Sequence, residues 1–370
     1  MEPDDRASAF GSGGRLPVTV PFESLAEDRP GAAWARVFGA GWPGWSEWLG
    51  DRDGGAAELR RAERALRRHM PEIAPVWERL VEVAGADARA ARFLTFWSPP
   101  RYILHCSQAV VVDDEGPALA RNYDLDPALN EGFLYRTAWL GRGVIGMADG
   151  LCGLADGMNA SGLAISLAFG GRAAVGPGFG VPLIVRYLLE VCRDAPDAVE
   201  ALRALPCHMS YNLTMIDRDG RHATAMLAPD RPAIVSDARA ATNHQLGVEW
   251  PRHGRESRTL ERAQALGRLM AERRPDAADL VARLLEPPLH SRAYAAGFGT
   301  VYTALYRPVA GRMELRWPGL EPVVQRLEAV TPGIRRILFA DGAFPREAAV
   351  APHRTPAASA ARPQDRSHLP

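Results

Sequence analysis

Three clusters of polar and nucleophilic residues could carry chemistry. The first joins His-Cys-Ser-Gln at 105–108 to Arg-Asn-Tyr-Asp at 121–124, the second is Asp-Gly-Met-Asn-Ala-Ser-Gly-Leu at 156–163, and the third is Thr-Asn-His at 242–244. A cysteine becomes a covalent nucleophile when a neighbouring base takes the proton of its thiol. Cys106 is therefore the candidate nucleophile, and the other clusters supply candidates for its base and for groups that bind substrate.

The elements around the first cluster change in character at the Ser-Pro-Pro of 98–100. Before it, apolar residues recur at helical spacing, which predicts helices over 56–69, 71–84 and 87–96. After it, a β-branched run at 108–112, an Asp-Asp-Glu-Gly turn and a returning run predict a hairpin. Cys106 is therefore expected at the start of a strand, with Arg121 and Asp124 on the strand that returns.

Farther along the chain, runs of strands alternate with pairs of helices. Such an order indicates sheets layered with helices rather than an alternating parallel fold. The remaining expected elements are strands at 133–140, 143–149, 162–168, 212–216, 222–227, 299–306 and 312–316 and helices at 181–193, 196–205, 256–272 and 275–285.

The two ends of the chain differ from the rest in composition. Residues 1–20 are rich in Gly and Asp and are expected to be disordered, and residues 22–53 are rich in tryptophan and must pack against something. The tail 346–370 is rich in Ala, Pro and Arg without periodicity, which predicts disorder.

Composition excludes several classes of partner. The chain has 44 basic and 44 acidic residues, so its net charge is zero and it lacks the basic excess typical of nucleic-acid binding. The acidic start of the sequence does not resemble a signal peptide, and no apolar run reaches the ~18 residues of a membrane span. We therefore expect a cytoplasmic protein with neither a nucleic-acid nor a membrane partner.

The four cysteines, Cys106, Cys152, Cys192 and Cys207, are too scattered for a disulfide framework. None forms a Cys-x-x-Cys pair, and the histidines lack the spacing of metal ligands. We expect no metal and no cofactor.

Taken in order, the clusters resemble the penicillin-acyltransferase-like branch of the N-terminal-nucleophile (Ntn) hydrolases. That branch includes isopenicillin N acyltransferase and is related to penicillin V acylase and bile salt hydrolase. The likeness covers roughly residues 55–325, including the helical stretch 56–96. It implies an α+β fold, a four-layer αββα sandwich, with residues 1–105 as a helical segment separated by autocleavage and 106–345 as the catalytic region.

The resemblance also implies catalytic roles. Cleavage before Cys106 would free its α-amino group, whose ordinary pKa of about 7.7–8.0 suits a base, so one residue would supply both nucleophile and base. Asp124 matches the family residue that holds the resulting ammonium, Arg121 would favour the thiolate, and Asn243 matches an oxyanion donor. Asn159 matches a second pocket or oxyanion residue. Arg258 lies near the family's distal arginine, and Arg262 is close enough to leave the register open.

Structural roles remain open for most of these residues. Arg121 and Asp124 could form an ion pair near a hairpin end, Asn159 could make a turn before Gly162, and Asn243 could cap a loop. Arg258 could be a solvated helix residue. His244 allows a different mechanism, in which its imidazole is the base for Cys106 as in papain-like enzymes.

These assignments predict acyl transfer through a thioester on Cys106. The first hypothesis is an autoproteolytic acyltransferase of secondary metabolism that takes its acyl group from an amide or from a thioester such as acyl-coenzyme A. The second is a hydrolase of N-acylated small molecules, and the third is a non-catalytic binding protein on the same fold. The expected partners are a small-molecule donor and acceptor, with the two cleaved fragments remaining associated.

Overall fold

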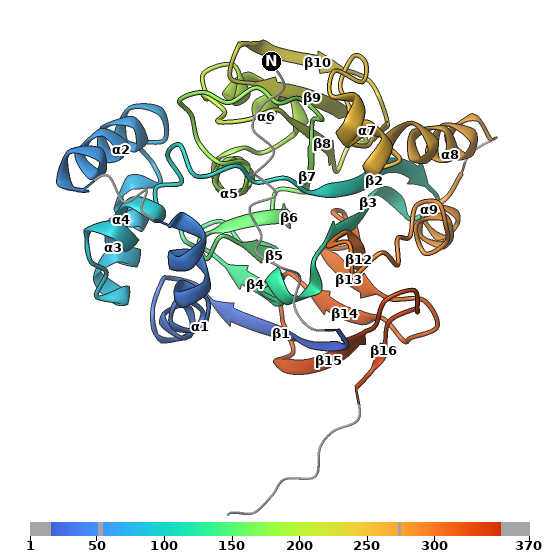
Figure 1. Cartoon of the computed structure of the whole chain (residues 1–370), viewed down its shortest axis with the longest axis horizontal. Helices are drawn as coiled ribbons and strands as arrows, with labels where there is room; N and C mark the ends of the chain where they lie inside the picture. The colour runs from blue at the N-terminus through green and yellow to red at the C-terminus, as the bar shows by residue number, and fades with distance from the viewer. Residues whose placement is uncertain (1–15, 51–54, 273–274, 349–370) are drawn as a thin grey trace, which may run out of the picture.

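The computed structural model describes residues 16–50, 55–272 and 275–348 and contains two β-sheets (Figure 1). The larger is ten-stranded and the smaller six-stranded. In spatial order, the larger sheet consists of β10 (Arg231–Ser236), β9 (His222–Ala228), β8 (Tyr211–Asp217), β7 (Leu163–Phe169), β6 (Gly153–Asn159), β5 (Val144–Asp149), β4 (Phe133–Thr137), β1 (Val18–Glu27), β15 (Gly333–Phe339) and β16 (Arg346–Glu347). The smaller consists of β11 (Ala240–Ala241), β2 (His105–Asp113), β3 (Gly116–Leu125), β12 (Gly299–Arg307), β13 (Arg312–Arg316) and β14 (Val323–Arg326).

The helices complete a layered arrangement. They are α1 (Ala32–Leu49), α2 (Gly55–His69), α3 (Ala74–Ala84), α4 (Ala88–Phe93), α5 (Val181–Val191), α6 (Ala195–Leu202), α7 (Pro251–Glu256), α8 (Thr259–Ala271) and α9 (Ala277–Leu284), with a short 3-10 turn, η2, at Pro127–Leu129. Helices α5 and α6 pack on the larger sheet, β2 and β3 pack against β7 and β8 of that sheet, and α8 and α9 cover the smaller sheet. This order confirms the predicted αββα sandwich.

The central strands are buried on both faces, as a sheet inside a four-layer sandwich requires. Every residue of β6, β7 and β8 is buried. Gly157 in β6 shows how tightly the layers meet, because a Cβ there would lie 2.8 Å from the Ile145 carbonyl oxygen and 2.9 Å from a Leu189 methyl group of α5. The Asp-Gly-Met-Asn stretch therefore lies within a strand in the middle of the larger sheet, which the sequence did not lead us to expect.

The region before residue 105 differs from the expected helical segment. Helices α1–α4 cluster at one side of the sandwich, but β1 enters the larger sheet itself, parallel to β4 and antiparallel to β15 (Figure 1). The Glu27 carboxylate at the end of β1 accepts hydrogen bonds from the backbone N–H groups of Ala33 (2.9 Å) and Trp34 (3.0 Å) at the start of α1. Such an anion stabilises a helix N-terminus, which helps the tryptophan-rich stretch to form a helix despite Pro43 inside it.

The disorder predicted for the two ends of the chain concerns mostly residues outside the described part of the structure. Of the first twenty residues, 1–15 lie outside the described part, and β1 begins at Val18. Of the tail, Arg346 and Glu347 form β16, which pairs with β15, and 349–370 lie outside the described part. Within the described residues, no helix combines the length and apolar character needed to cross a membrane.

Candidate active site

The hairpin of β2 and β3 brings the first cluster together. Cys106 lies opposite Tyr123 and Gln108 lies opposite Arg121. Because alternate residues of a strand share a face, the side chains of Cys106 and Arg121 both enter the layer between the sheets. Nη2 of Arg121 lies 2.7 Å from Sγ of Cys106, and both side chains are fully buried.

Arg121 is held in turn by Asp156 of β6. Its Nη1 lies 2.6 Å from Asp156 Oδ2, and neither side chain is exposed. The Tyr302 hydroxyl donates to the same oxygen at 2.8 Å, and the Tyr306 hydroxyl donates to Oδ1. A buried ion pair persists when further hydrogen bonds satisfy its remaining atoms, and here two tyrosines of β12 do so. Asp156 belongs to the second cluster, but sequence reasoning gave it no role.

Burial dominates the acidity of the thiol in this uncleaved chain. It raises the pKa of Cys106 to about 11, and the guanidinium of Arg121 lowers it only in part. Cys106 is therefore a neutral thiol in this state, and the expected thiolate does not follow from Arg121 alone.

Asn243 bridges the peptide on both sides of His105. Its Oδ1 accepts the backbone N–H of Cys106 at 3.0 Å, and its Nδ2 donates to the Leu104 carbonyl, also at 3.0 Å. Nδ2 donates as well to the Phe169 carbonyl at 3.0 Å. Because every partner of Oδ1 is a donor and every partner of Nδ2 is a carbonyl, the contacts decide the orientation of the amide. The third cluster thus meets the first at the bond before Cys106.

Arg262 of α8, rather than Arg258, reaches Cys106 and Asn243. Its Nη1 donates to the Cys106 carbonyl at 2.6 Å and to Ser107 Oγ at 2.9 Å, and its Nη2 donates to Asn243 Oδ1 at 2.6 Å. Arg258 instead pairs with Glu261, and both of these side chains are at least half exposed, at 57% and 50%. Arg262 is buried within α8, whereas Arg258 lies just before this helix with a left-handed backbone (φ 50°) and an exposed side chain. The structure thus places Arg262, and not Arg258, beside Cys106 and Asn243, and the role of Arg258 in substrate binding stays a prediction.

Asp124 lies beside the His105–Cys106 bond, on the face of the smaller sheet that α8 and α9 cover. It pairs with His105 across the hairpin, and its Oδ1 accepts the Thr300 hydroxyl at 2.7 Å. Its Oδ2 lies 3.9 Å from Nη1 of Arg262. Burial raises the pKa of Asp124 to about 6, although Arg262 and the Thr300 hydroxyl oppose the rise. A carboxyl in this position could hold a cation that forms at the start of β2.

Asn159 does not join the site. Its Nδ2 donates to the carbonyls of Leu189 (2.9 Å) and Cys192 (2.8 Å), and its Oδ1 accepts the backbone N–H groups of Ser161 (3.0 Å) and Leu163 (3.1 Å). All four contacts tie the turn between β6 and β7 to the end of α5. In the uncleaved chain both hydrogens of the Asn159 amide are donated to carbonyls, which leaves neither of them free for the predicted oxyanion role.

The histidine that could have served as a base lies elsewhere. Nδ1 of His244 contacts the Thr259 hydroxyl at 2.9 Å and the Thr242 hydroxyl at 3.3 Å. Among the described residues, no hydrogen bond joins His244 to Cys106, and no group of three His, Cys, Asp or Glu side chains is arranged to hold a metal ion.

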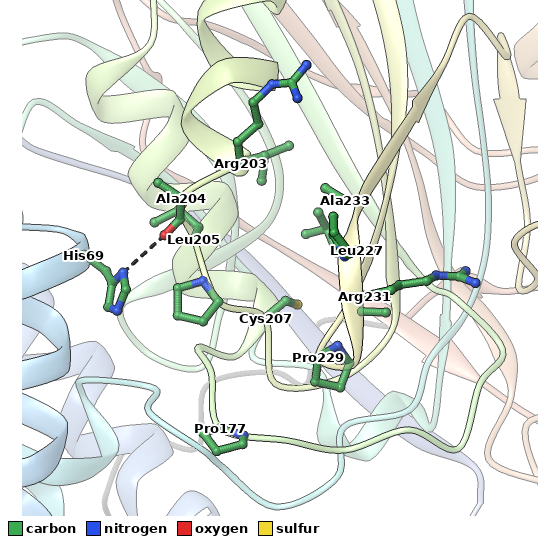
Figure 2. A pocket seen from close by; sticks show the side chains of 14 residues that line it. His69, Pro177, Arg203, Ala204, Leu205, Cys207, Leu227, Pro229, Arg231 and Ala233 are labelled. Carbon is green, nitrogen blue, oxygen red and sulfur yellow. Dashed lines mark hydrogen bonds between the residues drawn. The ribbon is translucent and has the colours of Figure 1, made fainter.

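One surface cavity lies where the helical region meets the sandwich (Figure 2). It has a volume of about 280 Å³, and its wall includes His69 at the end of α2, Cys207, and Arg231 of β10. Nδ1 of His69 contacts the Ala204 carbonyl at 3.1 Å, and this contact joins α2 to the segment after α6. None of the predicted site residues lines this cavity, which lies at the contact between these two regions.

Solved structures similar to this chain include three enzymes at low identity. A mutant of the conjugated bile acid hydrolase from Clostridium perfringens is 12% identical, with 62% of this chain and 96% of that chain covered and a TM-score of 0.42. Penicillin V acylase from Agrobacterium tumefaciens is 13% identical, with 62% and 90% covered and a TM-score of 0.42. The Caenorhabditis elegans ortholog of N-acylethanolamine-hydrolyzing acid amidase is 18% identical, with 55% and 93% covered and a TM-score of 0.41. No curated protein matches the sequence.

A family model gives the decisive match. The model of acyl-coenzyme A:6-aminopenicillanic acid acyl-transferase matches residues 111–321, more than half of the 370 residues. The matched stretch begins shortly after Cys106 and contains Arg121, Asp124, Asp156, Asn243 and Arg262. The chain therefore belongs to the acyl-coenzyme A:6-aminopenicillanic acid acyl-transferase family.

Proposed function

We propose that the protein is an autoproteolytic, cysteine-dependent acyltransferase in which Cys106 is both the point of cleavage and the catalytic nucleophile. Family membership supports the reaction class, acyl transfer or amide hydrolysis. The observation that carries the proposal is the placement of Asn243, which contacts the Leu104 carbonyl and the Cys106 N–H and so holds the chain on both sides of the His105–Cys106 bond.

Cleavage would begin with attack of Cys106 Sγ on the carbonyl carbon of His105. The ring formed has five members, and the C–N bond then breaks as the thiol proton passes to the departing nitrogen. The product is a thioester between the His105 acyl group and Sγ. Water hydrolyses this thioester, leaving a carboxylate on His105 and a free thiol and amine on Cys106. The balance needs no reactant besides water.

The same groups would then serve turnover. The new α-amino group of Cys106 has an ordinary pKa near working pH and can take the thiol proton. Asp124, whose Oδ2 lies 3.9 Å from Nη1 of Arg262 in the intact chain, would stabilise the resulting ammonium. In the intact chain Nδ2 of Asn243 donates to the Leu104 carbonyl. When that segment moves away, the same N–H becomes available to the oxyanion of an acyl substrate.

The acyl donor we propose is a small amide or an acyl thioester such as acyl-coenzyme A, and the acceptor is an amine or water. Attack on the donor carbonyl would load Sγ as a thioester and release the donor's amine or thiol. The acceptor would then take the acyl group from Sγ. Transfer and hydrolysis use the same residues and differ in whether water reaches the acyl-enzyme.

We also propose that the fragment before the cut stays bound. Strand β1 lies between β4 and β15, with hydrogen-bonded neighbours on both sides. The indole N–H of Trp34 in α1 donates to the Leu151 carbonyl at 2.9 Å from within the core. Removing this fragment would open the larger sheet and expose its hydrophobic face, so the two fragments should form one stable particle.

Intact mass under denaturing conditions tests the cleavage. Wild-type protein should give a fragment that begins at Cys106, whereas Cys106→Ala should remain a single chain. Cys207→Ala is the matched control, because Cys207 is also buried but lies outside the site, and it should cleave as the wild type does. Incubation with acyl-coenzyme A should then add one acyl mass to the Cys106 fragment. An active wild-type chain that stays intact, or a cleaved Cys106→Ala variant, would refute the proposal.

A further inference from the structure

A second buried polar cluster lies three residues before the proposed cleavage point. The Tyr102 hydroxyl donates to both carboxylate oxygens of Asp149, at 2.7 and 2.8 Å, and lies 2.7 Å from the Tyr123 hydroxyl. Tyr123 also donates to Asp149, at 3.0 Å. We call Asp149, Tyr123 and the two tryptophans described next the Tyr102 cradle. Asp149 ends β5, and Tyr123 lies directly opposite Cys106 in β3.

The tryptophan-rich helix α1 closes this cradle. The ring centroids of Trp45 and Trp48 lie 6.2 and 6.3 Å from that of Tyr102. The indole N–H of Trp45 donates to Glu131 Oε1 at 2.7 Å, which fixes the indole against the sandwich. Two of the tryptophans of α1, Trp45 and Trp48, therefore cover Tyr102 in the segment that leads to the proposed cut.

The backbone of that segment is held at two further points. The Tyr211 hydroxyl donates to the Tyr102 carbonyl at 2.6 Å, and Asn243 holds the Leu104 carbonyl as described above. Between these points and Cys106 only His105 remains, and its ring stacks on Phe298 with centroids 3.8 Å apart. The segment is thus held by its side chains as well as by its backbone.

The cradle also reaches the nucleophile. The guanidinium carbon of Arg121 lies 4.6 Å from the centroid of the Tyr123 ring, within the range of a cation–π contact. Arg121 in turn contacts Sγ of Cys106. Asp149, Tyr123 and Arg121 therefore connect the Tyr102 hydroxyl to the attacking sulfur through direct contacts.

We propose that Tyr102 is a positioning residue for autocleavage, which holds the His105 carbonyl within reach of Cys106 Sγ by anchoring its hydroxyl on Asp149 and Tyr123. The inference rests on the proposed function and concerns only the processing of that site. An intramolecular attack depends steeply on alignment, because a misplacement of about 1 Å costs on the order of 100-fold in rate. Tyr102 lies on the fragment that would end at His105, and the role proposed for it concerns the cut alone.

The test separates the rate of cleavage from the turnover of cleaved enzyme. Tyr102→Phe removes one hydroxyl, and we expect the Cys106 fragment to appear at least tenfold more slowly in freshly synthesised protein. Once fully cleaved, this variant should turn over acyl-coenzyme A within about twofold of wild type. A role confined to stability would change cleavage, turnover and the melting temperature together.

Tyr187→Phe is the matched control. The Tyr187 hydroxyl also donates to a carboxylate of the helical region, Glu72, at 2.8 Å, but it lies on α5 away from the cut. It should cleave at the wild-type rate. Asp149→Asn provides a second variant that keeps the volume and an acceptor oxygen, and it should also slow cleavage. If wild type cleaves and both Tyr102→Phe and Asp149→Asn cleave as fast as wild type, the role of Tyr102 is refuted and the proposed function stands. If wild type does not cleave, the proposed function and the role of Tyr102 both fail.

Discussion

The two sides of the His105–Cys106 bond are held by different kinds of interaction. On the side of Cys106, charged and amide groups dominate, and Arg121, Asn243 and Arg262 each contact two or more buried polar atoms. On the side of His105, aromatic rings dominate, with Tyr102 in its cradle and His105 on Phe298. On the side of Cys106, the polar side, the charged and amide groups would be needed in every turnover of the proposed reaction. On the side of His105, the aromatic side, the rings hold the segment from Tyr102 to His105 in place.

Under the proposed function, this difference predicts that the uncleaved chain is latent. Burial raises the pKa of the Cys106 thiol to about 11 in the uncleaved chain. The polar side is already assembled in the same state, with the buried pair of Arg121 and Asp156 in place. Cleavage would therefore alter access and supply an amine while leaving the arrangement of the polar groups as it is. Variants on the polar side should impair turnover, and variants on the aromatic side should impair the cut.

The largest effect is expected from Asp124→Asn. This change keeps the shape of the side chain but removes the charge that would hold the Cys106 ammonium, at a cost of roughly 2–5 kcal/mol. Turnover of cleaved enzyme should fall by about 30-fold to several thousandfold. His244→Ala should have a much milder effect, because His244 contacts threonines and not the thiol. Steady-state rates on acyl-coenzyme A, with thermal melting as the folding control, measure both.

The opposite ranking of these two variants would contradict the proposal that the α-amino group of Cys106 is the base and that Asp124 stabilises it. If His244→Ala abolished acylation while Asp124→Asn left it near wild type, the base would be an imidazole.

A smaller effect is expected from Arg262→Ala, with Arg258→Ala as its matched control. The first change removes a buried guanidinium from Asn243 and from the Cys106 carbonyl, so both cleavage and turnover should fall at least tenfold. The second removes an exposed partner of Glu261, and such pairs contribute about 0–1 kcal/mol. Mass spectrometry of cleavage over time and rates of acyl transfer distinguish the two. Equal losses in both variants would mean that the exposed arginine also binds substrate.

The smallest effect concerns Glu131, which supports the aromatic side through Trp45. Burial, reinforced by Asp149, raises the pKa of Glu131 to about 8 from an ordinary value near 4.5. The folded chain therefore binds a proton that the unfolded chain has released, so the free energy of unfolding should fall as pH rises from 6.5 to 8. In the uncleaved Cys106→Ala background we expect a loss on the order of 1 kcal/mol.

Glu131→Gln should flatten this dependence, while Glu82→Gln, at an exposed carboxylate, should leave it unchanged. Denaturant unfolding at several pH values between 6.5 and 8 measures the slope. A slope that Glu131→Gln does not alter would show that other groups cause it.

Much of the fold could be predicted because its signals are local. The helical periodicity of 56–69 and 181–193 corresponds closely to α2 and α5, and the Asp-Asp-Glu-Gly turn gave the β2–β3 hairpin that sets Arg121 near Cys106. Among the elements that were not predicted, α1 and β6 were missed for identifiable reasons. Glycines and Pro43 masked the helical character of α1, and β6 resembled a turn because the close approach of its neighbours requires Gly157.

The sequence by itself determined the nucleophile candidate, its hairpin companions and the family, because these depend on residue types and on spacing along one or two strands. Only the tertiary structure placed Arg262 rather than Arg258 beside Asn243, tied Asn159 to the end of α5, and brought Asp156 to Arg121 and Tyr102 to Asp149. These residues lie far apart in the chain, and their roles depend on which face of a helix or strand is buried against which layer. Arg258 and Arg262 are only four residues apart, yet Arg258 lies before α8 with a left-handed backbone and Arg262 lies within the helix and is buried. Only the packing of the layers decides which of the two reaches the interior.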